Sequence, residues 1–108
     1  MSKTPCLLVV EFPFAGPWGE ELTAACAGLA EAIAATPGLV WKLWIEKREE
    51  GRSGGVYLFE DEASAAAYME IHRPRLASFG VTEVTARTYA VNEALSRINA
   101  GPVAVNVV

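Results

Sequence analysis

A tryptophan-rich segment combines residue types that a plain core strand does not use. Residues 40–46 read Val-Trp-Lys-Leu-Trp-Ile-Glu, and in a strand their side chains would alternate between two faces. One face is then wholly apolar, whereas the other carries Lys42, Trp44 and Glu46. Large rings beside a few polar groups are typical of a pocket for a flat organic ligand. Trp44 is either a wall of such a pocket or a ring at a subunit interface. Lys42 and Glu46 could orient a ligand or stabilise its charge, but we prefer the interpretation that they form an ion pair with each other or across strands.

His72, the only histidine of the chain, is the candidate catalytic residue. It follows Tyr68 by four residues in a helical pattern, so both side chains should point toward the sheet. An imidazole titrates near neutral pH and could take a proton from a phenol or an enol. A histidine that bonds a carbonyl or carboxylate near a helix end is the alternative, with equal weight. A metal site is not expected, because the sequence has no cluster of His and Cys ligands.

Further residues are candidate contacts for a substrate. Tyr57 and Tyr68 could each donate a hydrogen bond to a substrate oxygen, or be half-buried rings whose hydroxyls reach water. Trp41 could line the pocket, with packing in the core or at the seam of a barrel as the alternative. Arg75 could hold an acidic ligand group at the pocket mouth, although a solvated charge at a helix end is the default interpretation.

The elements that would position these residues follow the order βαββαβ. This order predicts an α+β, ferredoxin-like fold with both helices on one face of a four-stranded antiparallel sheet. We expect Asp61 to cap the second helix and Pro74 to interrupt it, because proline lacks the N–H of a helix interior. The expected strands span 7–12, 40–46, 56–59 and 81–91, with a turn over 50–55; one helix runs from 20 to a stop at 36–38, and the other from 61 to 79–80.

Composition limits the class of protein. The 108 residues suit a single domain (1–108), and 52% hydrophobic with 20% charged residues excludes disorder. A net charge of −4 argues against nucleic acid and against an anionic membrane surface. The start of the chain is too briefly apolar for a signal peptide, which predicts a cytoplasmic protein. Cys6 and Cys26 read as small buried hydrophobic residues. The sequence has no phosphate loop and no flavin or nicotinamide fingerprint, so we expect no cofactor.

The segment 92–108 forms a C-terminal extension. Residues 92–98 suggest one or two helical turns, with Asn92, Ser96 and Asn99 in capping or closing roles. Residues 102–108 read as a last strand, which must pair with something. An exposed sheet edge of a neighbouring subunit is one candidate partner.

Several blocks along the chain resemble the YdhR-type monooxygenase family, within the antibiotic-biosynthesis-monooxygenase-like superfamily. The likeness spans about 7–99 and rests on residues 16–19, 37–44, 54–59, 72, 80–84 and 91–99. The resemblance implies a dimeric α/β barrel in which two ferredoxin-like subunits pack their sheets face to face. It further implies a ligand between the sheet and the helices of one subunit, as in relatives that oxidise aromatic polyketides without a cofactor or degrade haem.

Three functions therefore compete. The first is a homodimeric, cofactor-independent monooxygenase for a small aromatic or quinol-like substrate, with His72 as base, Trp44 and Tyr57 as pocket walls and Tyr68 as a hydrogen-bond partner. In it, dioxygen would react with an electron-rich substrate anion in a dry cavity. The second is a non-catalytic dimer that binds a hydrophobic ligand or haem. The third is a structural dimer whose own side chains fill the pocket, and the presence of a cavity separates it from the others.

Overall fold

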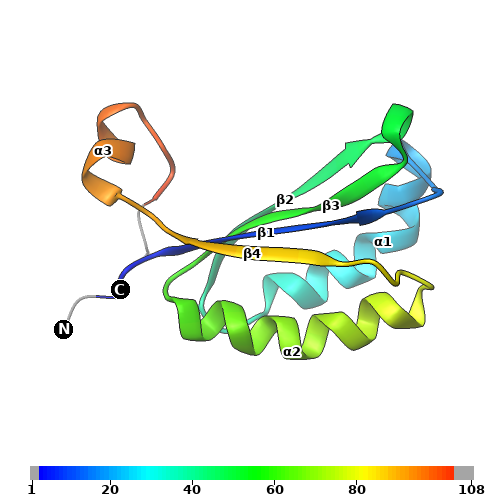
Figure 1. Cartoon of the computed structure of the whole chain (residues 1–108), viewed down its shortest axis with the longest axis horizontal. Helices are drawn as coiled ribbons and strands as arrows, with labels where there is room; N and C mark the ends of the chain where they lie inside the picture. Colours follow the sequence, from blue (N-terminus) through cyan, green and yellow to red (C-terminus); the bar gives the residue numbers. More distant parts are fainter. Residues whose placement is uncertain (1–2, 104–108) are drawn as a thin grey trace.

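The computed structural model describes residues 3–103 and has the predicted ferredoxin-like fold. Four antiparallel strands form one sheet in the order β2-β3-β1-β4. Helices α1 and α2 cover one face of this sheet, and no helix layer covers the other face in the described part of the chain (Figure 1). The elements are β1 (Cys6–Pro13), α1 (Gly19–Ala34), β2 (Leu39–Lys47), a 3-10 turn η1 (Arg48–Glu50), β3 (Arg52–Phe59), α2 (Glu62–Ser78), β4 (Thr85–Ala90) and α3 (Glu93–Ile98).

The two central strands, β1 and β3, supply the core beneath the helices. Every second residue of β1 is buried, beginning with Cys6, which is the alternation expected of a strand with one face on a core. The register pairs Leu8 with Tyr57 and Val10 with Gly55, so these residues share the helix face of the sheet. The buried cluster comprises Cys6, Leu8, Val10, Phe12, Ile33, Tyr57, Phe59, Ala65, Tyr68, Met69, Leu76 and Val81.

The hairpin between β2 and β3 has a shorter turn than predicted. Residues 52–55, expected in the turn, belong to β3, and the chain reverses through η1 and Gly51, whose φ is +62°. The sequence Ser53-Gly54-Gly55 reads as a turn, yet Gly54 is needed in the strand for packing. A Cβ there would collide with the carbonyl oxygen of Val10 on the neighbouring strand.

Helix α2 continues through Pro74, and the predicted interruption is wrong. A proline inside a helix costs about 3 kcal/mol through a lost hydrogen bond and a steric clash. Here the proline lies on the exposed side of the helix, and the last turn buries Leu76 on the opposite side. Burial of one such side chain stabilises by about 1.5–3 kcal/mol, so tertiary packing offsets the local cost.

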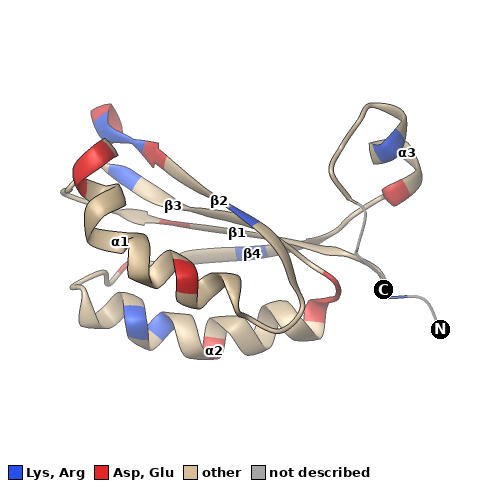
Figure 2. Cartoon of the chain, turned by 180° about the vertical axis from the view of Figure 1, so that it is seen from behind, with Lys and Arg blue, Asp and Glu red and all other residues tan. Residues whose placement is uncertain are grey.

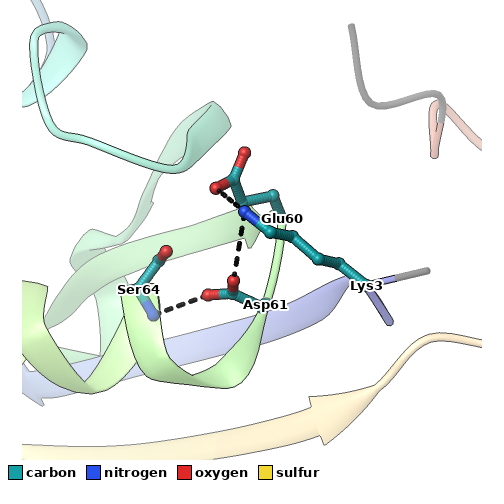
Figure 3. A network of polar contacts seen from close by, with 4 residues as sticks. All are labelled: Lys3, Glu60, Asp61 and Ser64. Atoms are coloured by element: carbon teal, nitrogen blue, oxygen red, sulfur yellow. Dashed lines mark hydrogen bonds and ion pairs between the residues drawn. The ribbon is translucent and has the colours of Figure 1, made fainter. Parts of the chain in front are cut away.

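The N-terminus of α2 is capped as predicted. The backbone N–H of Ser64 donates to the Asp61 carboxylate at 2.8 Å, and Figure 3 shows this cap beside the side chain of Lys3. The Lys3 ammonium pairs with Glu60 at 2.7 Å and with Asp61 at 3.6 Å. These contacts tie the entry of β1 to the start of the helix that carries His72.

Strand β4 is shorter than the predicted span of 81–91. Val81 is buried in the core, and its N–H bonds the carbonyl of Leu76 at 3.0 Å. It therefore closes the C-terminus of α2, aided by Gly80 with a φ of +83°. Apolar alternation alone cannot distinguish this buried capping residue from the first residue of a strand.

Helix α3 lies beyond one end of the sheet, on the side away from α1 and α2 (Figure 1). The expected cap is confirmed, because the side chain of Asn92 accepts from the N–H of Leu95 at 3.0 Å. The Asn99 amide also donates to the carbonyl of Ser96 at 3.1 Å and closes the last turn. Most of the last strand predicted over 102–108 lies outside the described residues.

Charged residues gather around the β2–β3 turn and along the helices, while most of the sheet carries none (Figure 2).

Within residues 3–103, no helix combines the length and apolar character needed to cross a membrane.

Candidate functional site

A cavity of about 240 Å³ lies between the helix face of the sheet and the two long helices. Drug-sized ligands occupy pockets of about 300–1,000 Å³, so this one suits a smaller molecule. The sheet contributes Phe12, Lys42, Trp44, Ser53, Gly54 and Tyr57; α1 contributes Leu22, Ala25, Cys26 and Leu29; α2 contributes His72 and Leu76; and the connecting loops contribute Phe14, Gly16, Pro17, Phe79 and Val81.

His72 lies on the inner side of α2 and reaches this cavity with only 3% of its surface exposed. Its imidazole stacks on Tyr68, with ring centroids 4.8 Å apart and planes at 23°, and meets Tyr57 edge-on at 6.5 Å. The buried Nδ1 atom has no hydrogen-bond partner among residues 3–103, so the alternative of a histidine fixed by a carbonyl or carboxylate at Nδ1 is not seen there. Desolvation lowers the pKa of His72 to about 3, aided by the nearby charges of Lys42 and Arg75.

Tyr57 and Tyr68 form a buried pair below the cavity. The Tyr68 hydroxyl donates to the Tyr57 hydroxyl at 2.9 Å, and each side chain is 1% exposed. Desolvation raises the pKa of both phenols above the ordinary value, so both remain protonated at neutral pH. Only Tyr57 lines the cavity. Tyr68 therefore supports Tyr57 and His72 from behind rather than facing the cavity.

Lys42 and Trp44 form the β2 wall of the cavity. The Lys42 ammonium lies 3.5 Å from the centroid of the Trp44 ring and 4.7 Å from that of Tyr57. The preferred interpretation of Lys42 as the partner of Glu46 is not what the structure shows, because the Glu46 carboxylate accepts from the N–H of Gly19 at 2.8 Å. Lys42 forms no ion pair with any of residues 3–103.

The other candidate contacts, Trp41 and Arg75, do not line this cavity. Trp41 pairs with Leu58 across the strands and so belongs to the sheet face without helices. Its indole N–H donates to the carbonyl of Pro102 at 2.9 Å, which holds the segment after α3 against β2. Arg75 extends toward Tyr68, with its guanidinium carbon 5.7 Å from the ring centroid.

Together, these groups can bind a flat molecule against aromatic rings and present it with one neutral imidazole and one amine. A metal centre has no support within residues 3–103, where no group of three or more His, Cys, Asp or Glu side chains is placed to hold an ion.

The comparison with protein families now decides the relationship. The family described as "Putative mono-oxygenase ydhR" matches residues 7–102. This chain belongs to the YdhR monooxygenase family. The resemblance drawn from the sequence over 7–99 is thereby confirmed. A comparison with curated proteins gave no match.

Solved structures similar to this YdhR-family chain share its fold at low sequence identity. SnoaB, a cofactor-independent oxygenase from Streptomyces nogalater, is 13% identical with a TM-score of 0.59 over 82% of this chain and 94% of its own. A monooxygenase from the gene ActVA-Orf6 of Streptomyces coelicolor, in complex with nanaomycin D, is 19% identical with a TM-score of 0.60 over 82% and 88%. MupZ from Pseudomonas fluorescens is 14% identical with a TM-score of 0.60 over 90% and 80%.

Sequence reasoning on this YdhR-family chain missed several cavity walls. From the sequence, Cys26 reads as a buried hydrophobic residue, Phe79 marks only a helix end, and Phe14 carries no functional signal. The spacing of His72, Leu76 and Phe79 was an available signal, since steps of four and three residues place them on one side of a helix. No comparable signal marks Phe14 or Cys26, because their approach to the cavity depends on how β1 and α1 pack.

Proposed function

We propose that this YdhR-family chain is a homodimeric, cofactor-independent monooxygenase that oxidises a small aromatic or quinol-like substrate in the cavity between sheet and helices. The observation that carries the proposal is a cavity walled by aromatic rings, into which a buried histidine projects without a partner for Nδ1 within residues 3–103. Such a cavity counts against the structural dimer, whose own side chains would fill the space. The similar ActVA-Orf6 monooxygenase, solved with nanaomycin D, is consistent with a small organic ligand.

In this proposal His72 is the general base. Burial keeps the pKa of His72 far below 7, so the imidazole is neutral at physiological pH and a weak base before the substrate is ionised. A substrate anion formed beside it would offset the charges of Lys42 and Arg75, which contribute to that low pKa, and would make the imidazole a better acceptor. The substrate anion would then reduce dioxygen and combine with it to a peroxide. This peroxide would take back the proton from His72 and lose one water molecule as the substrate carbon becomes a carbonyl.

Tyr57 and Trp44 serve as walls and orienting groups. The Tyr57 hydroxyl remains protonated and lines the cavity, so it can donate to a substrate oxygen. Trp44 offers a ring face for stacking, and Tyr68 holds Tyr57 in place through the shared hydrogen bond. Trp41 and Arg75 lie outside the cavity, and we assign them no contact with the substrate.

The second candidate is a protein that binds the same class of ligand without oxidising it. The low pKa of His72, about 3, favours this alternative, since general bases work best when their pKa lies near the operating pH. Both candidates use the same cavity, so only a measurement of turnover separates them.

We extend the proposal to a dimer in which the helix-free sheet faces meet. The cross-strand pairs place mainly apolar side chains on this face, and Leu43, on the edge strand β2, is 58% exposed. An apolar face of this kind is typical of an interface between subunits. The face carries Leu7, Val9, Trp41, Leu43, Ile45, Val56, Leu58 and Tyr89, with Glu11, Lys47, Arg52 and Arg87 as its charged members.

A ligand titration with oxygen measurement tests the function. Tryptophan fluorescence of wild type and His72→Ala would be followed against naphthoquinols and anthrones while an electrode records oxygen uptake. We expect quenching with uptake in wild type and loss of uptake in His72→Ala. Tyr89→Phe, a change on the opposite sheet face, is the matched control and should keep both signals. Equal quenching in all proteins without oxygen uptake would reject the monooxygenase and support the second candidate, a binding protein. No quenching in any protein would reject the cavity as a ligand site.

A further inference from the structure

Lys42 is the one amine of the cavity, and its surroundings differ from those of the other described lysines. Lys3 and Lys47 each pair with carboxylates at 2.7 Å and 2.9 Å. The half-buried Lys42 instead lies over the rings of Trp44 and Tyr57 and has no ion pair within residues 3–103. An amine turned toward apolar walls with no counter-ion is costly to keep charged, which makes a structural role a poor explanation for it.

The strand next to β2 makes room for this amine. Gly55 lies opposite Trp44 in the sheet, and a Cβ at Gly55 would stand 2.7 Å from Cε of Lys42 and 2.9 Å from Cε1 of Tyr57. Because Gly55 has no side chain, the Lys42 side chain can extend over β3 toward Tyr57. Its side chain ends beside the same cavity that His72 and Tyr57 line.

The groups around Lys42 include no carboxylate among the described residues that line the cavity. Arg75 and His72 approach from α2, Tyr57 lies beneath it on β3, and the Cys26 thiol faces it from α1. Neither Asp nor Glu lines the cavity among the described residues. Burial lowers the pKa of Lys42 to about 7, and the Arg75 charge adds to this effect. The cavity thus offers a ligand one amine, and no Asp or Glu among the described lining residues neutralises it.

We propose that Lys42 selects ligands that carry an acidic hydroxyl group, a phenol or an enol, by binding the ionised oxygen. The inference rests on the proposed function, because it uses the same cavity, and it names the chemical class of the ligand. The flat rings stack against Trp44 and the ammonium provides the counter-charge. A hydrogen bond between charged partners in a site with little water contributes more than one between neutral groups.

The proton balance sets a distinct pH signature. The bound state pairs a ligand oxyanion with the Lys42 ammonium. A ligand hydroxyl that arrives protonated gives its proton to His72, the proposed base, which passes it to the buffer when Lys42 is charged, or to Lys42 when the amine is neutral. For a ligand that is already ionised, affinity must fall as the pH rises above about 7, because the free amine then has to be protonated on binding. Removal of the amine removes this dependence.

The experiment is calorimetric titration with lawsone, a hydroxynaphthoquinone that is ionised at neutral pH, and with its O-methyl ether, which cannot ionise. Wild type should bind lawsone more tightly than the ether by about tenfold or more. Lys42→Met should lose that preference through weaker binding of lawsone alone. Lys42→Arg should keep it and retain the affinity at about pH 9, because a guanidinium stays charged there. Lys47→Met removes an exposed lysine of the same strand and should match wild type.

The outcomes separate this inference from the proposed function. Equal affinity of wild type for both compounds, or an unchanged preference in Lys42→Met, would overturn the role of Lys42 and leave the cavity as a ligand site. Binding of neither compound to wild type would overturn both. Near-ultraviolet circular dichroism and the unfolding midpoint of each variant verify that Lys42→Met retains the native fold. Lys42→Arg is a second test of the role of Lys42, whatever the result for Lys42→Met. If Lys42→Arg loses the preference for lawsone, a role based on charge is contradicted.

Discussion

The imidazole of His72 stacks on the ring of Tyr68 one helical turn before it, with the two ring planes 23° apart. The contact places the histidine beside the cavity, where burial and the charges of Lys42 and Arg75 lower its pKa and keep it neutral. The unfolded chain has no such contact, and there the imidazole titrates near its ordinary value. The difference between the two states has a measurable effect on stability.

His72→Phe should make the protein less sensitive to acid. The pKa of His72 falls from 6.5 to about 3 on folding, so between these values the unfolded state binds more protons than the folded one. Wild type therefore loses stability as the pH falls through this window, and the full contribution is present above it. Between about pH 7 and pH 4, the variant should lose about 1–3 kcal/mol less unfolding free energy than wild type.

Urea unfolding at several pH values measures this effect. The carboxylates and other titrating groups are common to both proteins, so their contributions cancel in the difference. Parallel pH profiles for the two proteins would contradict a neutral, buried His72.

Tyr68→Phe should destabilise the fold by leaving the Tyr57 hydroxyl buried without its partner. Loss of one member of a buried hydrogen bond costs about 1–3 kcal/mol, and both side chains are 1% exposed. The double variant Tyr57→Phe/Tyr68→Phe should cost less than the sum of the single changes, because no unpaired hydroxyl then remains. Guanidinium unfolding of the four proteins of this cycle gives the coupling, with half-exposed Tyr89→Phe as the matched control. Strict additivity would mean that the two hydroxyls do not interact.

The adjacent glycines of β3 should respond differently to alanine. Gly54→Ala would collide with the backbone carbonyl of Val10, which cannot move without shifting β1, so we expect a loss of about 1–3 kcal/mol in unfolding free energy. Gly55→Ala meets the flexible end of Lys42 and the edge of the Tyr57 ring. We expect a smaller loss of stability but weaker binding of lawsone, because both side chains line the cavity. Unfolding and calorimetric titration together test the contrast, and a Gly55→Ala protein that binds like wild type would contradict it.

Leu43→Glu should convert the proposed dimer into a monomer. Leu43 is exposed on the helix-free sheet face, and a face-to-face interface would have to bury one new carboxylate from each subunit, at a large desolvation cost. Light scattering after size-exclusion chromatography gives the mass. Ile71→Glu is the matched control, since Ile71 is similarly exposed, at 61%, but lies on α2. A monomeric wild type, or a Leu43→Glu protein that keeps the mass of the dimer, would reject this interface.

Local sequence patterns were enough to predict the order of elements, the sides of the strands and the helix starts. These features depend on local chemistry: alternation with period two in β1 and β2, the carboxylate of Asp61 at the start of α2, and the Asn92 side chain at the start of α3. The same local information placed His72 and Tyr68 on one helix side. The family resemblance needed only blocks of residues in order, and the family match agrees with it.

Tertiary structure decided the features that depend on residues far apart in the chain. Local preference stops a helix at Pro74, but the burial of Leu76 against the sheet outweighs it. At Lys42 the folded chain places the ammonium over the rings of Trp44 and Tyr57, whereas the Glu46 carboxylate accepts from the N–H of Gly19. Whether Tyr68 reaches a ligand depended on Tyr57, which lies between it and the cavity. Each of these outcomes depends on contacts between residues that are far apart in the sequence. Such contacts exist only in the folded chain.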